Sequence, residues 1–218
     1  MTYNEIRKNP EVCALLDKGN QNLGVLGFTD HSEAHCVLVA HRAANVLRDL
    51  GFDLRIQELA RIAGFMHDIG NAINRTHHAE LGALLANDIL KQTDMPLEDR
   101  IAVIAAIGQH DESTGRSMDP ISAALILGDK TDVRRSRVRS KDSSTFDIHD
   151  RVNYAVTGSA LQISPEERTI TLNLQIDESI CTMYEYFDIF LNRMLMCRSA
   201  AEMLGCRFRL VANGDKVL

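Results

Sequence analysis

The sequence predicts a mainly α-helical protein that ends in a small α+β module. Apolar residues recur at helical intervals through residues 1–150, in segments separated by Gly, Pro and Asp. Apolar and polar residues then alternate strictly over 170–176, which is typical of a half-buried strand. Helical spacing returns over 179–204. We therefore expect a helical domain over 1–150 and a β-β-α-β module over 151–218.

The first two predicted helices have recognisable start and stop signals. Asp30 and Glu33 have the spacing of a capping box, which favours a helix start at Asp30. Gly51 follows the last apolar position of this segment, where a helix commonly ends. A second run of apolar residues at helical intervals follows directly. The sequence thus predicts helices over 30–50 and 54–66.

Three further helices complete the predicted helical domain. The third begins near His77 and carries four leucine residues at helical positions. Pro96 suits the first turn of a fourth helix, which runs to about Gln109. Asp119, followed by proline, is a start signal for the fifth. The apolar run of that last helix is interrupted by Asp129.

The pattern changes in the C-terminal quarter of the chain. Residues 153–163 are rich in strand-forming side chains, and the turn sequence SPEER separates them from the alternating segment 170–176. The helix predicted over 179–204 ends before Gly205, and CRFRLV follows as a short strand. The wide apolar stripe of this helix, over 183–194, predicts packing against the sheet, with dimerisation as the alternative.

Composition and charge exclude several classes of protein. The 218 residues are 45% hydrophobic and 25% charged with a net charge of −6, so an overall basic nucleic-acid-binding surface is not expected. There is no run of about 18 apolar residues, so we expect no membrane span, and the polar start does not resemble a signal peptide. Five cysteines without a CxxC spacing predict reduced thiols and a cytoplasmic location.

Histidine and aspartate residues recur at the ends of the predicted helices. Imidazole supplies neutral nitrogen ligands and carboxylate supplies charged oxygen ligands, a mixture that suits Zn, Fe, Mn or Co. Asp129 would be costly to bury within its apolar run without a cation or hydrogen-bond donors. A single such residue is more often structural, so the ordered set across five helices is the stronger signal. The set comprises His35, His67, Asp68, His78, His110 and Asp129.

Five motifs resemble those of the HD superfamily of metal-dependent phosphohydrolases. They are HSEAHCVLVA, AGFMHDIG, HHAELGA, IGQHDESTG and LILGDKTDVRR, and together they cover roughly residues 28–140. The resemblance implies an all-helical HD-domain core. It also implies that the basic metal ligands are His35, His67, Asp68 and Asp129. Two-metal branches of the superfamily have additional histidines, which would here be His78 and His110.

Three details refine this resemblance. Asn71 follows HDIG where the family commonly has Lys, which removes one phosphate contact. No Gly-Tyr-Pro follows His110, which argues against the cyclic dinucleotide branch. The stretch from His110 to Arg135 is similar to bacterial dinucleoside tetraphosphate hydrolases. His31, one turn before His35 on the same helical face, remains a candidate for substrate contact.

The implied cofactor is a divalent metal, one or two ions of Fe, Mn, Zn, Co or Mg, which would activate a water molecule for attack on phosphorus. Asp68 is the natural bridging ligand between two ions, and Lys130 would bind a phosphate oxygen or stabilise the transition state. These two residues are the expected catalytic pair. Arg134 and Arg135, about one helical turn beyond Asp129, are further candidates for substrate binding.

The expected function is hydrolysis of a small-molecule phosphate, preferably a nucleotide or a related phosphate ester. Two alternatives stay open at this stage. Di-iron oxygenases of the HD type use six similar ligands, and ligand identity alone does not separate them from hydrolases. A non-catalytic ligand-sensing HD protein is the third reading, although an intact ligand set argues against it. A homodimer is also left open.

Overall fold

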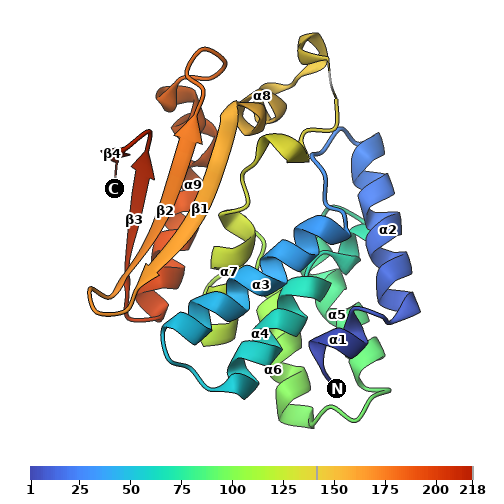
Figure 1. Cartoon of the computed structure of the whole chain (residues 1–218). Helices are drawn as coiled ribbons and strands as arrows, with labels where there is room; N and C mark the ends of the chain where they lie inside the picture. Colours follow the sequence, from blue (N-terminus) through green and yellow to red (C-terminus); the bar gives the residue numbers. More distant parts are fainter. Residues whose placement is uncertain (141, 218) are drawn as a thin grey trace.

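The computed structural model describes residues 1–140 and 142–217 (Figure 1). The N-terminal part is helical, as predicted. Its helices are α1 (Tyr3–Ile6), α2 (Pro10–Val25), α3 (Glu33–Asp49), α4 (Leu54–Met66), α5 (His78–Leu90), α6 (Leu97–Gly108) and α7 (Pro120–Lys130). The C-terminal part contains α8 (Ile148–Ala155), β1 (Val156–Ser164), β2 (Thr169–Ile176), α9 (Met183–Met203), β3 (Arg207–Ala212) and β4 (Asp215–Lys216). Short 3-10 turns lie at Ile69–Ala72, Arg135–Arg137 and Ser143–Thr145.

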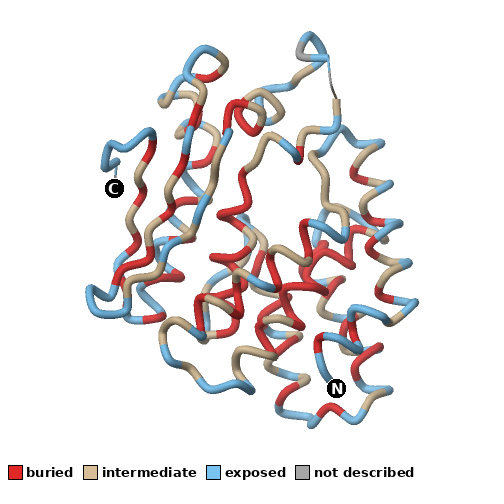
Figure 2. The backbone as a smooth tube through the Cα atoms, viewed as in Figure 1, coloured by how far each residue is buried: buried red, intermediate tan, exposed pale blue. Residues whose placement is uncertain are grey.

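Helix α7 lies at the centre of the core and packs against α3, α4, α6 and α9. Its residues 123–127 are fully buried, and the tube in Figure 2 is red along this helix. Two glycines let the surrounding helices approach closely. A Cβ atom on Gly64 of α4 would lie 2.7 Å from the Ala40 Cα atom, and one on Gly128 of α7 would lie 2.9 Å from the Val39 carbonyl oxygen. This close packing brings the ends of α3, α4 and α7 together.

The four strands form one mixed sheet in the order β1-β2-β3-β4. Strands β1 and β2 pair antiparallel, whereas β2 and β3 pair parallel, with α9 as the connection between them. The buried face of β2 carries Ile170, Leu172 and Leu174, all fully shielded from solvent. Helix α9 packs on this sheet and also on α7, and in Figure 1 it lies behind the strands. Strand β1 also contacts α3, so both α9 and the sheet attach this module to the helical core.

Three features differ from the sequence-based expectations. The prediction of a capping box at Asp30 is wrong, because α3 begins at Glu33 and its N-cap residue is Ser32. The Asp30 carboxylate instead accepts a hydrogen bond from the Ser32 hydroxyl at 2.5 Å. The strand predicted from residue 153 begins only at Val156, since the preceding residues form the last turn of α8. The short helix α1 and helix α2 were not predicted individually, and strand β4 was not predicted at all. The division at residue 150 falls within α8 and stays a prediction.

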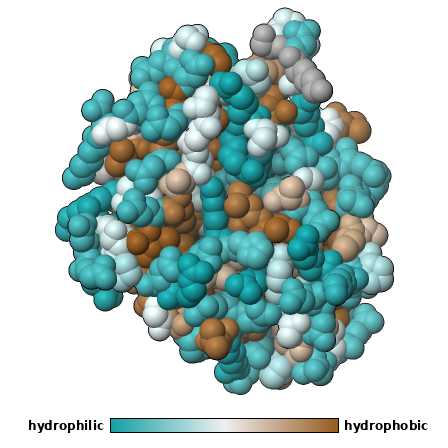
Figure 3. Space-filling model, viewed as in Figure 1, coloured by the Kyte–Doolittle hydropathy of each residue, from teal (hydrophilic) through white to brown (hydrophobic). Residues whose placement is uncertain are grey.

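The surface and the cysteines bear on two further expectations. The face in Figure 3 is mostly hydrophilic, with separate small apolar patches. No helix among residues 1–140 and 142–217 is long and apolar enough to cross a membrane. All five cysteines are free thiols, and four of them are buried. The free thiols agree with the predicted absence of a disulfide framework.

Candidate metal centre

The predicted ligands come from the ends of five different helices and converge on one region. His35 lies in the first turn of α3, His67 is the C-cap of α4, and Asp68 follows it directly. His78 is the first residue of α5, and Asp129 lies in the last turn of α7. His110 follows α6, two residues past its end. The four histidines and Asp68 are each at most 4% exposed, so the group is almost entirely shielded from water.

A first group of ligand atoms surrounds one point. The His35 Nε2 atom lies 3.4 Å from Asp129 Oδ1, and the His67 Nε2 atom lies 3.3 Å from Asp68 Oδ2. His67 Nε2 is also 3.8 Å from Asp129 Oδ1. Ligand atoms about 2.1 Å from a metal ion in a tetrahedral or octahedral shell are separated by roughly 3 to 3.5 Å. The spacing of these atoms therefore fits a divalent ion between them.

The same atoms lack any other partner. His35 Nε2, His67 Nε2 and Asp68 Oδ2 are buried and form no hydrogen bond with the described part of the chain. Burying polar atoms in this way is costly unless a partner satisfies them. One metal ion would satisfy all three at once. The residues therefore fit the metal that the sequence implies.

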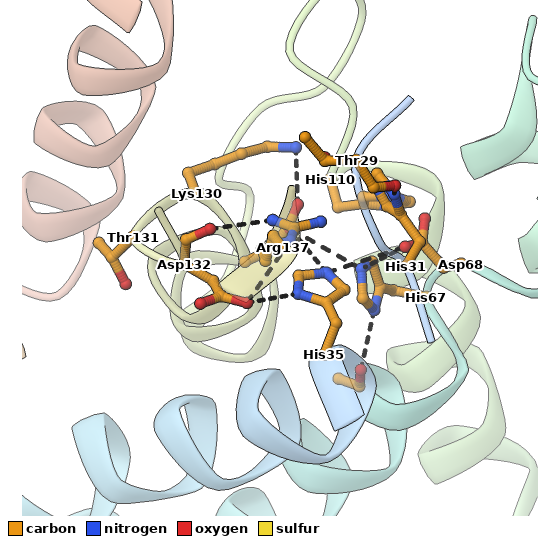
Figure 4. Close-up of polar contacts among 12 residues, drawn as sticks. Thr29, His31, His35, His67, Asp68, His110, Lys130, Thr131, Asp132 and Arg137 are labelled. Carbon is orange, nitrogen blue, oxygen red and sulfur yellow. Dashed lines mark hydrogen bonds and ion pairs between the residues drawn. The ribbon is translucent and has the colours of Figure 1, made fainter. Parts of the chain in front are cut away.

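The second nitrogen of each histidine ring is held by the protein. His35 Nδ1 donates to Asp132 Oδ2 at 2.7 Å, with the His35 ring lying between Asp132 and Asp68 (Figure 4). His67 Nδ1 donates to the Gly64 carbonyl oxygen at 2.8 Å. The corresponding acceptors for the other two rings are the carbonyl oxygens of Arg75 for His78 and Ile107 for His110. Each bond places the proton on Nδ1 and leaves the Nε2 lone pair free to bind metal.

A second group of ligand atoms lies beside the first. The Nε2 atoms of His78 and His110 are 3.0 Å apart. Because both rings carry their proton on Nδ1, two lone pairs face each other, an arrangement that a cation stabilises. Asp68 Oδ1 lies 3.9 Å from His78 Nε2, while Asp68 Oδ2 faces His35 and His67. The Asp68 carboxylate thus has one oxygen toward each group, as a bridging ligand requires.

Asn71 helps to orient this bridging carboxylate. Its side-chain amide donates to Asp68 Oδ1 at 2.7 Å and to the Asp68 carbonyl oxygen at 3.1 Å. The residue that replaces the lysine common in this position of the family is therefore buried against the ligand. Asn71 therefore cannot provide the positive charge that a lysine would offer to a substrate phosphate. Other cations of the site would have to provide that charge.

The electrostatics favour the metal-binding protonation states of Asp68, Asp129, His78 and His110. At His67, burial lowers the pKa, but Asp68 and Asp129 raise it above its ordinary value. Burial raises the pKa of the Asp68 carboxyl, but His67, His31 and His35 together hold it well below its usual value. Burial also raises the pKa of Asp129, but Lys130, His35 and His67 together hold it well below its usual value. Burial lowers the pKa values of His78 and His110. Both carboxylates are thus charged, and these two imidazoles are neutral, at pH 7.

A cavity of about 470 Å³ opens beside the ligands. It is large enough for a small phosphate ester. Its walls include metal-centre residues together with four cationic side chains. The ligands in the wall are Asp68, His78, His110 and Asp129, and the cations are Arg75, Lys130, Arg137 and Arg193.

The predicted substrate-binding residues, together with the predicted catalytic Lys130, divide into two groups. His31 and Lys130 line the cavity, and Lys130 Nζ lies 2.6 Å from Asp129 Oδ2. Arg134 and Arg135 are not among the residues that line it. The prediction assumed that the helix continues for another turn beyond Asp129. Helix α7 in fact ends at Lys130, so Arg134 and Arg135 do not extend its cavity-facing side. Arg134 forms an ion pair with Asp132.

Arg135 is also engaged away from the cavity. Its Nε atom donates to the Tyr154 carbonyl oxygen at 2.6 Å, and its guanidinium lies 4.5 Å from the centre of the Tyr154 ring. Arg137 instead lines the cavity, while its Nε donates to the Asp30 carbonyl oxygen and its Nη1 to that of Asp132. Arg134 and Arg135 as phosphate contacts therefore stay predictions, and Arg137 is a further cation in the cavity wall.

Sequence reasoning missed several residues of the site. Asp132 is completely buried and orients His35, although its short distance from Asp129 in the sequence was the only available signal. Phe190 and Arg193 of α9 also line the cavity. Nothing in their local sequence pattern indicates this, because the contact depends on how α9 packs against α7.

Comparison with known proteins agrees with this geometry. The model of the HD domain matches residues 33–152. The uncharacterized protein MJ1020 of Methanocaldococcus jannaschii is 27% identical over 173 residues, which are 68% of this chain and 66% of that protein. Ribonuclease Y of Campylobacter jejuni subsp. doylei is 28% identical over 141 residues, and that of Cutibacterium acnes is 34% identical over 97 residues.

The shared region is only part of these relatives. The two matches to Ribonuclease Y cover 63% and 43% of this chain but 24% and 15% of the relatives' own lengths. The family match, by contrast, covers more than half of the chain and contains all six residues of the candidate metal centre. The chain therefore belongs to the HD-domain family, whose members are generally metal-dependent phosphohydrolases.

Proposed function

We propose that this protein is a metal-dependent phosphohydrolase that acts on a nucleotide or a related phosphate ester. The observation that carries the proposal is the position of Asp68, whose two carboxylate oxygens face two separate groups of ligand atoms. The ligands of the first group are His35, His67, Asp68 and Asp129, and those of the second are Asp68, His78 and His110.

Bound divalent ions would lower the pKa of a water molecule to roughly 7 and neutralise the charge of the phosphate. The chain's own residues would position the substrate. The Lys130 side chain is 9% exposed and lines the cavity, and its Nζ atom contacts the ligand Asp129. Its ammonium group could bind a phosphate oxygen and stabilise the charge that develops there. Arg137 presents a second buried cation to the same cavity.

The cavity wall also supports a nucleotide as the substrate. Phe28 lies in this wall and is 41% exposed. Arg75 also lies in the wall, and its guanidinium carbon is 5.3 Å from the centre of the Phe28 ring. Aromatic side chains bind nucleobases by stacking. Two relatives carry the name Ribonuclease Y, which supports a nucleotide-containing phosphate compound as the substrate.

The direct test is a panel of phosphomonoesters and phosphodiesters with Mn, Co, Mg, Fe and Ni. The panel includes bis-p-nitrophenyl phosphate, nucleoside phosphates and dinucleoside polyphosphates. We expect metal-dependent release of phosphate or nucleotide that is lost in Asp68→Ala. Oxygen uptake by the iron-loaded protein, with no hydrolysis of any ester in the panel, would instead indicate oxygenase chemistry and overturn the proposal.

A further inference from the structure

The C-terminal module contributes a cation to the cavity of the metal centre. Arg193 extends from α9, lines the cavity and has a side chain that is only 21% exposed. Its Nε atom donates to Glu112 Oε1 at 2.7 Å, and the centre of the Phe190 ring lies 4.3 Å from its guanidinium carbon. The side chain is therefore fixed on one edge by a carboxylate and on one face by an aromatic ring.

Glu112 lies between Arg193 and Lys130, the cation beside the metal centre. The same Glu112 Oε1 atom lies 4.0 Å from Lys130 Nζ. Lys130 is also in contact with the ligand Asp129, at 2.6 Å. Along this row of charges, Lys130 is next to the metal centre and Arg193 lies one carboxylate further away. An anion bound by Arg193 would therefore be a different group from the one at the metals.

The rest of the guanidinium is available to a ligand. Glu112 is the only residue of the described chain that hydrogen-bonds to Arg193, and it engages Nε alone. Both terminal nitrogens therefore donate to no acceptor within residues 1–140 and 142–217. A guanidinium with one face stacked and one edge fixed keeps its fork free, and this fork matches two oxygens of a phosphate group.

We propose that Arg193 binds a phosphate group of the substrate other than the one that is attacked, with Glu112 as its positioning residue. The substrate is then a compound with at least two phosphate groups, such as a nucleoside diphosphate or triphosphate. This inference rests on the proposed function, because it names the substrate class of the same site. It assigns to the C-terminal module a role in substrate selection.

The kinetic test compares a one-phosphate substrate with a nucleoside triphosphate. Arg193→Met removes the charge and keeps most of the side-chain volume. We expect it to raise KM for the triphosphate roughly 10- to 100-fold more than KM for bis-p-nitrophenyl phosphate, the loss expected for charge-assisted hydrogen bonds. Arg193→Lys should recover part of this difference. Equal effects on both substrates, or no effect on either, would overturn the proposal.

A matched control is available on the same helix. Arg198 is 57% exposed as a side chain and lies 3.9 Å from Glu202, four residues along α9. Arg198→Met should leave both KM values unchanged. Glu112→Gln should raise KM for the triphosphate selectively, because Arg193 loses the charge that positions it. Circular dichroism and metal content of each variant would establish that it is folded.

A binding measurement separates this inference from the proposed function. Calorimetric titration of the magnesium-loaded protein with inorganic pyrophosphate and with inorganic phosphate needs no turnover. We expect Arg193→Met to weaken pyrophosphate binding roughly 10- to 100-fold more than phosphate binding. If no ester is hydrolysed but this difference is found, the proposed function fails and the anion site stands. If hydrolysis is found but the difference is absent, only the assignment of Arg193 fails.

Discussion

Substitution of Asp132 by Asn tests how the protein prepares His35 for metal binding. Asp132 is fully buried, and one of its oxygens accepts the His35 Nδ1 proton at 2.7 Å. The Arg134 side chain donates to both carboxylate oxygens, and its Nη2 atom lies 3.0 Å from the oxygen that His35 uses. An asparagine has only one acceptor oxygen, so its amide group would face one of these donors. Whichever way the amide turns, His35 loses the charged acceptor that fixes its ring and raises the basicity of its Nε2 atom.

The size of the effect follows from these contacts. A hydrogen bond to a charged group contributes about 1.5–3 kcal/mol. Loss of an outer-shell partner of a metal-bound histidine typically lowers metal affinity roughly 10- to 100-fold, which corresponds to about 1.4–2.7 kcal/mol. We expect Asp132→Asn to weaken binding of the first metal ion by this amount. The fold should persist, because natural domains have about 5–15 kcal/mol of stability.

The assay is competition for Mn²⁺ or Zn²⁺ between the protein and a chelator of known affinity. Asp88→Asn is the control, because the Asp88 side chain is 63% exposed and, among the described residues, forms an ion pair only with Lys91. Circular dichroism of the metal-free proteins provides the check on folding. Unchanged metal affinity in a folded Asp132→Asn protein would refute the role of Asp132 as the partner that orients His35.

Three other predictions concern catalysis, substrate and stability. Asp68→Ala should abolish hydrolysis and lower metal content, whereas Lys130→Ala should keep the metal and lose about 10- to 1,000-fold in turnover; metal analysis and kinetics on both variants check this. Phe28→Ala should raise KM for nucleotides roughly 5- to 100-fold through lost base stacking and should affect bis-p-nitrophenyl phosphate less, as steady-state kinetics would show. Removal of metal with a chelator should lower Tm, because a ligand that binds only the folded state stabilises it.

Each of these has an outcome that contradicts it. Turnover by Asp68→Ala would exclude hydrolysis at this centre, while full activity of Lys130→Ala would remove only the role assigned to that lysine. Equal effects of Phe28→Ala on both substrates would argue against a base-binding wall. A Tm that is the same with and without metal would mean that the buried ligand atoms do not hold an ion in the folded protein.

Much of the helical architecture could be predicted from local sequence signals. Helix α4 has the predicted bounds, Leu54–Met66, because its apolar positions recur at regular intervals and Asp53 caps its first turn. Strand β2 was predicted from strict alternation, which reflects one face packed against α9. By contrast, α8 is eight residues long and mostly polar, so its pattern did not distinguish it from the strand that follows. Short polar helices depend on contacts that local periodicity does not report.

In the candidate metal centre too, some residues could be predicted from the sequence and others depend on how distant elements pack. The resemblance placed six ligand candidates, and the structure brings all six together. Close contacts at two glycines bring the ends of α3, α4 and α7 together, and these ends carry four of the six. Arg193 could not be predicted, since its place in the cavity depends on α9 packing against α7 across more than 60 residues of sequence. Arg134 and Arg135 were chosen by extending α7 beyond Lys130, where the helix in fact ends.

The central claim is that Asp68 bridges two metal ions. Anomalous diffraction from crystals grown with Mn²⁺ tests it most directly, because the ions are located without any assumption about activity. We predict two manganese peaks about 3.5–4 Å apart. One should be bound by His35, His67 and Asp129, the other by His78 and His110, with Asp68 between them. A single peak, or two peaks without Asp68 as a shared ligand, would contradict the claim.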